Sequence, residues 1–425
     1  TDRNGNTVAY QREPDGTLTR ATDIFGRSLG FAYNQGKVAS VAASAPGLAA
    51  PKQASYAYDA QGNLSQASDA NGDATAYGYA GNRLSTITYA NGGHTFYGYT
   101  PDGKVASESD DNGINKQTYA YFQSSTVVTD ANGRATTYEF LTKSGLKKVA
   151  KITDPLSGVT TFEYDANMNL TLQTDANRRA TRFRYDDRGN VLTVTDARFQ
   201  PTQLASYDAS FNQPGTVTDA KGNPTTLTYD ARGNLQQVKD AAGAFTFMSY
   251  DGFGHVSAVK DHFGKITAFG YDPGNGSLTS VTDPLSRTTQ MTRDGLSRVT
   301  KNTDPKQKNT FFDYDLEGNL TKVTDHLGGV TSYLYDKGRA GRLLRKVTDA
   351  RQQASGRGTL FSYDTQGRLA GVINPLQKFR TFGYDDKSRL HTINDAFGQT
   401  VLDYDELDRL KTKTLPNAEG VVTYA

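Results

Sequence analysis

The chain has 425 residues, a net charge of +2 from 47 basic and 45 acidic side chains, and neither Cys nor Trp. The missing cysteines exclude disulfides and thiolate metal sites, and the evenly spread charge offers no concentrated field to a nucleic acid or an anionic membrane. Aromatic residues make up 11% of the chain, which argues against disorder. No run of about 18 apolar residues is present, so we expect no membrane span.

One motif recurs along the chain: Tyr-Asp, two residues, Gly, then Asn or Arg, then an aliphatic residue. Clean copies begin at Tyr58, Tyr185, Tyr229, Tyr314 and Tyr363. The Tyr positions 164, 185, 207, 229, 250, 271, 314, 335, 363, 384 and 404 are mostly 21 or 22 residues apart. The wide gap after position 271 holds a degenerate copy in which Arg293-Asp294 replaces Tyr-Asp. The chain is therefore an array of about 20 short repeats.

A second motif, Thr-Asp with Gly three residues after the Asp, lies about ten residues from each copy of the first. Examples start at Thr129, Thr218 and Thr324, with Asn394-Asp395 as a variant. Asp can accept a hydrogen bond from the backbone two residues on, and Gly supplies the positive φ that a tight turn needs. Turns this close together leave no room for helices of ordinary length.

The segments between the turns alternate in character. Thr75, Tyr77 and Tyr79 fall on one face of an extended chain, and Phe183 and Tyr185 repeat the pattern between arginines. We therefore predict an all-β fold of tandem β-hairpins, with strands of about six residues and an aromatic stripe on one face. Two strands in each of about 20 units make roughly 40 strands, and at about 4.8 Å per strand the sheet runs on the order of 190 Å. Such a sheet twists and must coil, and the short period favours a continuous spiral over propeller blades.

The alternating Tyr-Asp-x-x-Gly-Asn/Arg-Leu and Thr-Asp-x-x-Gly motifs resemble the YD repeat of the RHS family over essentially all of residues 1–425. That family includes bacterial polymorphic toxins, the BC component of insecticidal Tc complexes and the teneurin shells of animals. The resemblance implies one continuous repeat array that forms part of a hollow β cocoon. It further implies a secreted or cell-surface protein of a bacterial secretion system, with an enclosed C-terminal toxin domain and possible secretion-system components as partners. Because the chain begins and stops inside repeat units, we expect it to be a fragment of a longer protein.

Three copies depart from the motif. Met168 and Phe211 stand where Gly is expected, and Tyr121 is followed by Phe122 instead of Asp. We expect these three positions to lack the standard turn, while the periodicity on either side preserves the fold.

No residue is assigned a catalytic, cofactor-binding or metal-binding role. The five histidines, at positions 94, 255, 262, 326 and 391, lack metal-ligand spacing, and we expect them to be exposed or to line turns. The segment Asp69–Asp73 resembles the start of a calcium loop but lacks its closing Glu, so we interpret it as a turn. Asp154-Pro155 and Asp283-Pro284 resemble part of the Asp-Pro segment associated with RHS self-cleavage; both sit at ordinary second turns, and we expect no cleavage there.

Two insertions interrupt the period. Ala42–Ser55 contains two Pro and many Ala, which is typical of a flexible surface loop. Lys337–Gly358 carries six basic residues after its first residue, Lys337, namely Arg339, Arg342, Arg345, Lys346, Arg351 and Arg357. This second insertion is either a docking patch for an acidic partner or a set of solvated loops that lengthen one hairpin, and we favour the loops.

The sequence thus predicts a structural shell and not an enzyme, with steric confinement of a toxic domain as its role. A cell-surface module that binds glycans or proteins through its aromatic stripe remains the alternative. An enzymatic function is a weaker third possibility, because no residue can be named to carry it.

Overall fold

A computed structural model describes residues 1–48, 50–143, 145–339, 341–416 and 420–424. Within them lie 39 β-strands in one sheet, together with two short 3₁₀ turns, η1 (Asp111–Gly113) and η2 (Gln353–Ser355). Each strand pairs antiparallel with the next strand in the chain, from β1 with β2 to β38 with β39. The predicted all-β class and the predicted number of strands are confirmed.

The strands are short and follow one another at nearly constant spacing. The first thirteen are β1 (Val8–Arg12), β2 (Leu18–Asp23), β3 (Ser28–Asn34), β4 (Lys37–Ser44), β5 (Lys52–Tyr58), β6 (Leu64–Ser68), β7 (Ala74–Ala80), β8 (Arg83–Thr88), β9 (His94–Tyr99), β10 (Val105–Asp110), β11 (Gln117–Tyr121), β12 (Ser125–Thr129) and β13 (Ala135–Lys143). The next thirteen are β14 (Leu146–Thr153), β15 (Val159–Tyr164), β16 (Leu170–Thr174), β17 (Ala180–Tyr185), β18 (Val191–Thr195), β19 (Pro201–Ala205), β20 (Thr216–Thr218), β21 (Pro224–Tyr229), β22 (Leu235–Lys239), β23 (Phe245–Tyr250), β24 (Val256–Lys260), β25 (Ile266–Tyr271) and β26 (Leu278–Thr282). The last thirteen are β27 (Thr288–Arg293), β28 (Val299–Thr303), β29 (Asn309–Tyr314), β30 (Leu320–Thr324), β31 (Val330–Lys337), β32 (Arg342–Thr348), β33 (Thr359–Tyr363), β34 (Leu369–Ile373), β35 (Phe379–Tyr384), β36 (Leu390–Asp395), β37 (Gly398–Tyr404), β38 (Leu410–Thr414) and β39 (Val421–Thr423).

The two motifs occupy opposite edges of the sheet. Loops that follow odd-numbered strands carry the Tyr-Asp motif or its variants, and we call their row the Tyr-Asp edge. Loops that follow even-numbered strands, together with the loop that precedes β1, carry the Thr-Asp motif or its variants and form the Thr-Asp edge. This segregation follows from antiparallel pairing, because successive turns of a meander lie at alternate ends of its strands.

The hairpin turn explains the motif residue by residue. At Asp230 the backbone N–H donates to the carbonyl of Asn234 at 2.9 Å, and Gly233, with φ of 78°, donates to the carbonyl of Asp230 at 2.9 Å. The Asp230 carboxylate accepts from the backbone and the side-chain nitrogens of Asn234, at 2.8 and 3.0 Å. This is a type I turn closed by a glycine bulge, and it needs Asp, Gly and Asn at these places.

The motif tyrosine ties neighbouring hairpins together. The hydroxyl of Tyr229 donates to the carbonyl of Pro214 at 3.0 Å, and Tyr250 and Tyr185 make the same bond to residues 15 positions earlier. In the degenerate copy, Nε of Arg293 donates to the carbonyl of Leu278 at 2.6 Å, again 15 positions earlier. Arg293 therefore replaces the function of the tyrosine hydroxyl as well as its place in the sequence.

The sheet is a single curved layer. In β7 and β17 the aromatic face is half-buried and the opposite face exposed, as predicted. Among the described residues Met168 is the one buried hydrophobic side chain, at 5% exposure. The hydrogen-bonded ladder and the half-buried stripe therefore stabilise this fold, because one layer of strands cannot enclose a conventional core.

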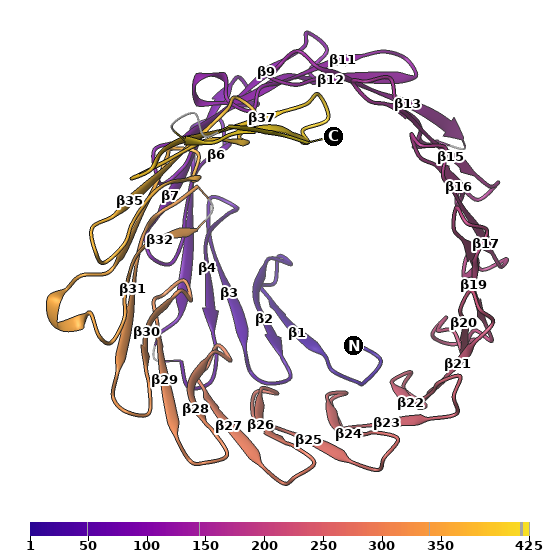
Figure 1. The fold of residues 1–425 in the computed structure, drawn as a ribbon. Helices are drawn as coiled ribbons and strands as arrows, with labels where there is room; N and C mark the ends of the chain where they lie inside the picture. The colour runs from indigo at the N-terminus through magenta and orange to yellow at the C-terminus, as the bar shows by residue number, and fades with distance from the viewer. Residues whose placement is uncertain (49, 144, 340, 417–419, 425) are drawn as a thin grey trace.

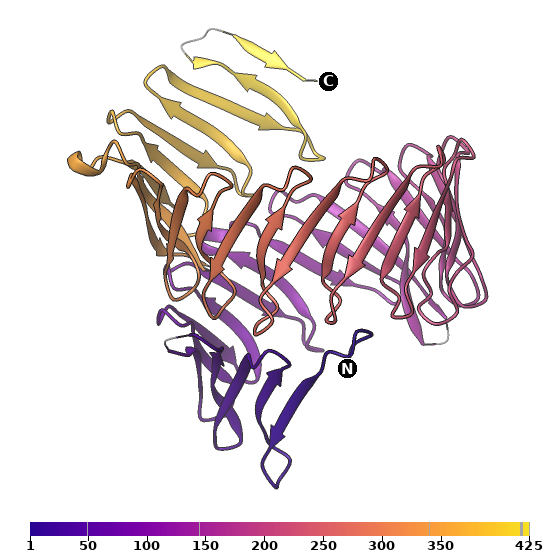
Figure 2. The same cartoon turned by 90° about the horizontal axis from the view of Figure 1, so that it is seen from below.

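The curved layer winds into a spiral. Figure 1 shows the strands arranged around a central axis, with the N-terminal strands β1–β4 beside the course of β24–β30. In Figure 2 the indigo N-terminal strands lie on one side of the salmon band and the yellow C-terminal strands on the other, so the sheet overlaps itself and does not close end to end. The predicted spiral is confirmed.

Of the three sequence expectations about turns, one needs correction and two are confirmed. Met168 has φ of 65° and completes a standard turn, with its N–H 3.2 Å from the carbonyl of Asp165. The expectation that the turn is lost there is wrong, because the surrounding bonds hold a non-glycine residue in the left-handed region. At Phe211 the turn does differ: it is one residue longer, and Asn212 takes the positive φ of 54°. The Tyr121 loop also differs, closing through a bond from Phe122 N–H to the Ser125 carbonyl.

Candidate functional site: the seam between two rounds

The most extensive long-range contacts join two rounds of the spiral along a line that we call the seam. Its contacts link residues from 228 positions apart, as in Phe25 and Phe253, to 274 positions apart. In each case the Thr-Asp edge of the first round meets the Tyr-Asp edge of the second round. The seam is thus built from the tips of hairpin turns and not from paired strands.

The seam begins at the loop before β1. Arg3 donates to the carbonyl of Gly233 at 2.9 Å, and Asn234 donates to the side-chain oxygen of Asn4 at 3.0 Å. Asn6 donates to the carbonyl of Phe253 at 3.0 Å. These contacts leave Asn234 only 3% exposed, so a motif residue that is ordinarily half-buried becomes part of a closed interface.

The next two turns add packing. The ring of Phe25 meets that of Phe253 edge to face, with centroids 5.1 Å apart, a favourable geometry for aromatic pairs. Farther along, the loop between β4 and β5 lies against Gly295, where a Cβ would come within 2.6 Å of the Pro46 carbonyl oxygen. The expected flexible loop Ala42–Ser55 is therefore wrong in two respects. Its ends belong to β4 and β5, and its middle is held in the seam; Ala49 lies outside the described residues.

The second insertion supplies the most buried charges of the seam. Lys337 and Arg342 approach the carboxylate of Asp73 at 3.2 and 3.1 Å, and the Asp73 side chain is only 8% exposed. From the same loop, Nη2 of Arg339 lies 2.7 Å from Oδ1 of Asp110, with side-chain exposures of 16% and 12%. The Arg339 guanidinium also lies 4.3 Å from the centre of the Tyr89 ring.

This geometry corrects the interpretation of residues 337–358. The expected solvated loop is wrong for Arg339 and Arg342, and their acidic partners belong to the first round of the same chain. Arg345 instead pairs locally with Asp336 in an exposed position, and Arg351 pairs with Asp349 at 3.9 Å. Ala340 lies outside the described residues. The sequence signal that was missed is the charge of the turns. Basic side chains cluster at the loop between β31 and β32, and their acidic partners Asp73 and Asp110 lie on the Thr-Asp edge.

The far end of the seam is polar as well. Asn115 N–H donates to the carbonyl of Asp386 at 2.7 Å, and Lys387 pairs with Asp130 at 2.6 Å. Burial raises the pKa of Asp110, but hydrogen bonds from Arg339 and Asn115 outweigh it and leave the pKa below its usual value. Burial likewise raises the pKa of Asp130, and the bond from Lys387 brings it below the usual value. Both carboxylates are thus held as anions facing cations.

The histidines do not converge on a common site. His94 and His255 each place Nδ1 2.9 Å from a carboxylate, of Asp111 and Asp251 respectively, and His391 contacts the Leu402 carbonyl. The ring centres of His262 and Phe263 lie 3.7 Å apart with the rings tilted by 43°, and His326 lies 3.2 Å from Lys308 Nζ. Across the described part of the chain, no group of three His, Asp or Glu side chains has the arrangement of a metal site.

The segment that resembles a calcium loop is a turn. Asp69 accepts the backbone N–H of Asn71 and of Asp73, at 3.0 and 2.8 Å, as the other motif aspartates do. Asp154 and Asp283 make the same two bonds in their own turns, so the predicted turn interpretation is confirmed for all three. In all three turns the Oδ1 atom of the aspartate accepts both bonds.

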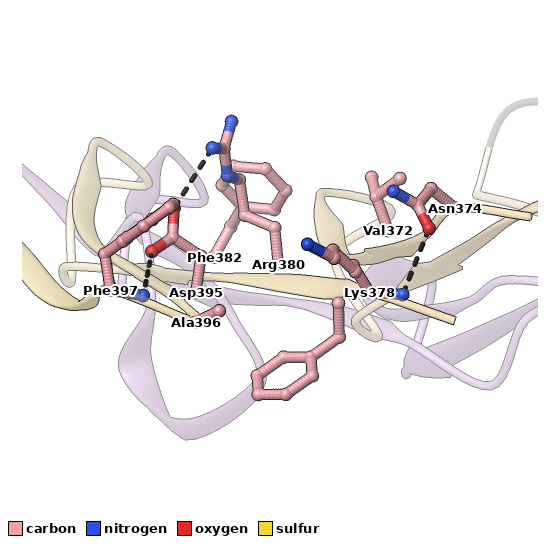
Figure 3. A pocket seen from close by; sticks show the side chains of 9 residues that line it. Val372, Asn374, Lys378, Arg380, Phe382, Asp395, Ala396 and Phe397 are labelled. Carbon is pink, nitrogen blue, oxygen red and sulfur yellow. Dashed lines mark hydrogen bonds and ion pairs between the residues drawn. The ribbon is translucent and has the colours of Figure 1, made fainter. Parts of the chain in front are cut away.

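A shallow groove lies on the Thr-Asp edge near the C-terminus. Figure 3 shows its lining, with Arg380 paired to Asp395 at 3.0 Å and Asn374 accepting from the Lys378 backbone at 3.0 Å. Phe382 and Val372 contribute apolar surface. Arg380 and Asp395 are engaged with each other, and the groove offers a binding surface.

Comparison with known proteins assigns the family. The RHS repeat family matches residues 58–94, and the teneurin YD-shell family matches residues 122–275 and 277–425, together more than half of the chain. The chain belongs to the teneurin YD-shell family. No curated protein matches it.

Solved structures agree with this YD-shell assignment. The crystal structure of TcdB2-TccC3-Cdc42 matches with a TM-score of 0.60 and 14% identity, covering 99% of this chain and 28% of the other. TcdB2-TccC3 without its hypervariable C-terminal region matches with a TM-score of 0.59, also at 14% identity, covering 98% of this chain and 27% of the other. The chain therefore spans little more than a quarter of the Tc toxin chains that it resembles, and the likeness concerns the fold.

No helix in the described residues is long and apolar enough to cross a membrane.

Proposed function

We propose that this YD-shell chain forms part of the wall of a container that isolates a toxic effector domain, itself not part of residues 1–425. The observation that supports the proposal is the seam, which joins successive rounds of one continuous sheet by buried ion pairs and packed turns. The wall acts by steric exclusion: its backbone groups are satisfied within the ladder, and its joints are filled by side chains. Residues 1–425 serve as one continuous repeat region with no catalytic residue of its own.

The remaining parts of the proposal come from the family. The enclosed partner is a C-terminal toxin domain of the parent protein, which is exported by a bacterial secretion system or displayed on the cell surface. Membership of the YD-shell family and the fold of the Tc toxin neighbours support a structural role of this kind.

The experiment is limited proteolysis of the full-length parent protein. We expect the cargo domain to resist cleavage at protease concentrations that digest the same domain expressed alone. Opening the seam with Arg339→Ala should restore cleavage, whereas Arg345→Ala, which removes an exposed local pair, should leave the cargo protected. Equal cleavage of enclosed and free cargo would refute the container.

The groove of Figure 3 favours a second candidate, a module that binds glycans or proteins. Phe379 is 55% exposed there, and exposed aromatic rings stack on sugars. A glycan array probed with residues 1–425 and with the Phe379→Ala variant tests it. Specific binding that is lost in the variant would favour this function over the container.

A further inference from the structure

Many contacts of the seam could form between any pair of turns. Four side chains of the first round donate to backbone carbonyls of the second round, and every turn of the repeat presents such carbonyls. The donors are Arg3, Asn6, Asn91 and Arg134, and the acceptors are the carbonyls of Gly233, Phe253, Thr365 and Asp405. If the second round were displaced by one hairpin along the first, equivalent acceptors would lie opposite the same donors. These bonds therefore hold the rounds together without selecting one register.

The twist of the sheet restricts the register but does not determine it. The loop before β1 meets the turn between β21 and β22, so one round comprises β1–β21. Neighbouring strands are rotated by about 20 to 25° on average, with individual angles from about 10 to 35°. Over a whole round this variation is large enough to accommodate a displacement of one hairpin. The observed register therefore depends on contacts that differ from turn to turn.

Gly295 is a glycine that its own turn does not require. It is the second residue of the turn Asp294–Arg298, and its φ lies outside the positive range that favours glycine. A Cβ at this position would lie 2.6 Å from the carbonyl oxygen of Pro46 and 2.7 Å from the backbone nitrogen of Leu48, both in the first round. The absence of a side chain thus serves the close approach of the two rounds.

The turns on either side of Gly295 could not take its place. They carry Pro273 and Leu316 at the same second position. A displacement of one hairpin in either direction would bring one of these side chains against the backbone at Pro46. Overlap of this kind forces the backbone apart, so the pairing of Gly295 with Pro46 fits one register only.

Gly93 has the corresponding role on the other edge of the seam. It is the fifth residue of the turn Tyr89–Gly93, and its φ also lies outside the positive range. A Cβ there would overlap the carbonyl oxygen of Thr365 in the second round. The fifth residues of the neighbouring turns are Asp73 and Ile114, which carry side chains. The close approach of Thr365 is therefore available at one turn and denied at its neighbours.

Asp73 adds a charge to this selection. Lys337 and Arg342 approach its carboxylate at 3.2 and 3.1 Å, and its side chain is 8% exposed. The turns before and after it, residues 45–48 and Tyr89–Gly93, contain neither Asp nor Glu. After a displacement of one hairpin the two cations would face a turn without a carboxylate, and a buried charge that loses its partner is costly.

We propose that Gly93, Gly295 and Asp73 form a register key, which selects one docking position among those that the twist brings within reach. The two glycines reject the other positions by steric overlap, and Asp73 rejects them through unpaired charge. Turns that depart from the motif on one edge are thus matched to particular turns on the other. The key acts within one chain and needs no cargo, so it goes beyond the proposed function.

Disulfide formation between introduced cysteines reports the register, because the chain has no cysteine of its own. Asn91→Cys with Thr365→Cys joins two turns in contact, where Nδ2 of Asn91 lies 3.0 Å from the Thr365 carbonyl oxygen. Asn91→Cys with Asp386→Cys places the second thiol at the same position of the next turn. A disulfide needs Cα atoms within about 7 Å, whereas one hairpin displaces the turn by about 10 Å. Without further substitutions we expect the first disulfide and not the second.

A deletion separates the key from the number of repeats. Removing residues 165–185 takes out β16 and β17, which lie outside the seam, and rejoins Tyr164 to Asp186 as a Tyr-Asp motif. If the key selects the register, the shortened chain should still form the disulfide through Thr365→Cys. If the number of repeats in a round alone decided, the next turn would take its place and Asp386→Cys would react.

Moving the key should move the register. Gly295→Leu combined with Leu316→Gly shifts the steric part of the key by one hairpin, and Asp73→Asn removes the charge. In the shortened chain this triple variant should change the disulfide partner from residue 365 to residue 386. In the undeleted chain, where twist and key then favour different registers, both disulfides should form. The control is Asp187→Leu, which adds a leucine at a second turn position and removes one carboxylate outside the seam, and should leave residue 365 as the partner.

Three outcomes would overturn the proposal. Reaction at residue 386 in the shortened chain with its key intact would assign the register to the number of repeats. A triple variant of the undeleted chain that reacts at residue 365 alone would show that the key selects nothing, and this result decides even if the shortened chain does not fold. Failure of the Thr365→Cys disulfide in the chain without further substitutions would contradict the contact on which the key depends.

Discussion

Two turns with nearly the same sequence have different surroundings in the spiral. Asp23–Arg27 and Asp261–Lys265 both place Phe third and Gly fourth, and their glycines have φ of 75° and 78°. Each turn is closed by a bond of 2.9 Å from the first N–H to the fifth carbonyl. Yet Phe25 is half-buried against Phe253, whereas Phe263 is 73% exposed. Local sequence sets the turn, and the position of the next round of the spiral determines whether the third side chain of the turn is buried.

The same contrast applies to the charges. Arg339 and Asp110 are largely buried and face each other across the seam. Asp336 in β31 and Arg345 in β32, the strands on either side of the Arg339 loop, are each 52% exposed. A carboxylate deprived of its partner is costly only where water cannot replace that partner. The seam and the exposed surface of the sheet should therefore respond very differently to equivalent substitutions.

The largest difference is expected for the ion pairs. Arg339→Ala leaves Asp110 without its cation and removes the contact with the Tyr89 ring, so it should destabilise the seam by about 3 kcal/mol. Arg345→Ala should cost less than about 0.5 kcal/mol, because exposed pairs contribute little. Amide hydrogen exchange at Thr95 in β9 and at Gln366 in the turn after β33 measures the opening of the seam.

A double variant identifies the source of that loss. If the cost comes from the unpaired carboxylate, Arg339→Ala combined with Asp110→Asn should recover roughly half of it. Equal effects of Arg339→Ala and Arg345→Ala would show that the rounds are not joined by this pair.

Most of the fold could be predicted from the sequence because of the repeat, whereas the seam could not. Each turn depends on residues within five positions, as Asp230 and Asn234 show, so periodicity alone gives strands, edges and strand order. The seam depends on the number of repeats in a round, which is set by the accumulated twist of many strands. No local pattern joins Arg339 to Asp110, 229 positions away. For that reason the basic insertion suggested a solvated loop.

The second prediction compares Phe25 with Phe263, the phenylalanines at the third position of their turns. Phe25→Ala removes the edge-to-face contact with Phe253 and empties the space beside Gly276, and should destabilise the seam by about 2 kcal/mol. Phe263→Ala should change the stability of the single chain by less than about 0.5 kcal/mol. Thermal unfolding at protein concentrations low enough to keep the chain monomeric gives both values. A loss at Phe263 as large as that at Phe25 would mean that the turn itself, and not the seam, depends on the ring.

The third prediction separates two effects of adding a side chain at Gly276 and Gly189, the backbone strain of a positive φ and the steric clash with neighbouring atoms. Gly276→Ala and Gly189→Ala both place a Cβ at positive φ, which costs about 1 kcal/mol in either turn. At Gly276 the added carbon also meets the Phe25 ring, so this variant should be about 1 kcal/mol worse than the other. In a Phe25→Ala background the ring is gone and the two alanine variants should cost the same. If the two alanine variants still differ in stability in that background, the cause lies outside the contact between Phe25 and Gly276.

The smallest effect expected near neutral pH concerns the seam carboxylates. Folding lowers the pKa of Asp110 and of Asp130 below that of an unfolded Asp, about 3.9. The stability that they contribute is thus fully present above that unfolded value and is lost as the pH falls through the lower folded values. Between pH 7 and 5 the stability of the seam should change by less than about 0.5 kcal/mol, and below about pH 4 the seam should open, which small-angle scattering detects as an increase in radius.

Asp110→Asn should weaken this acid response because it removes one of the two titrating groups. Asp219→Asn removes a free-edge carboxylate whose pKa is lowered by the side-chain hydrogen bond from Asn223, and should leave the opening of the seam unchanged. Opening between pH 7 and 5 would indicate that another group, titrating in that range, holds the rounds together.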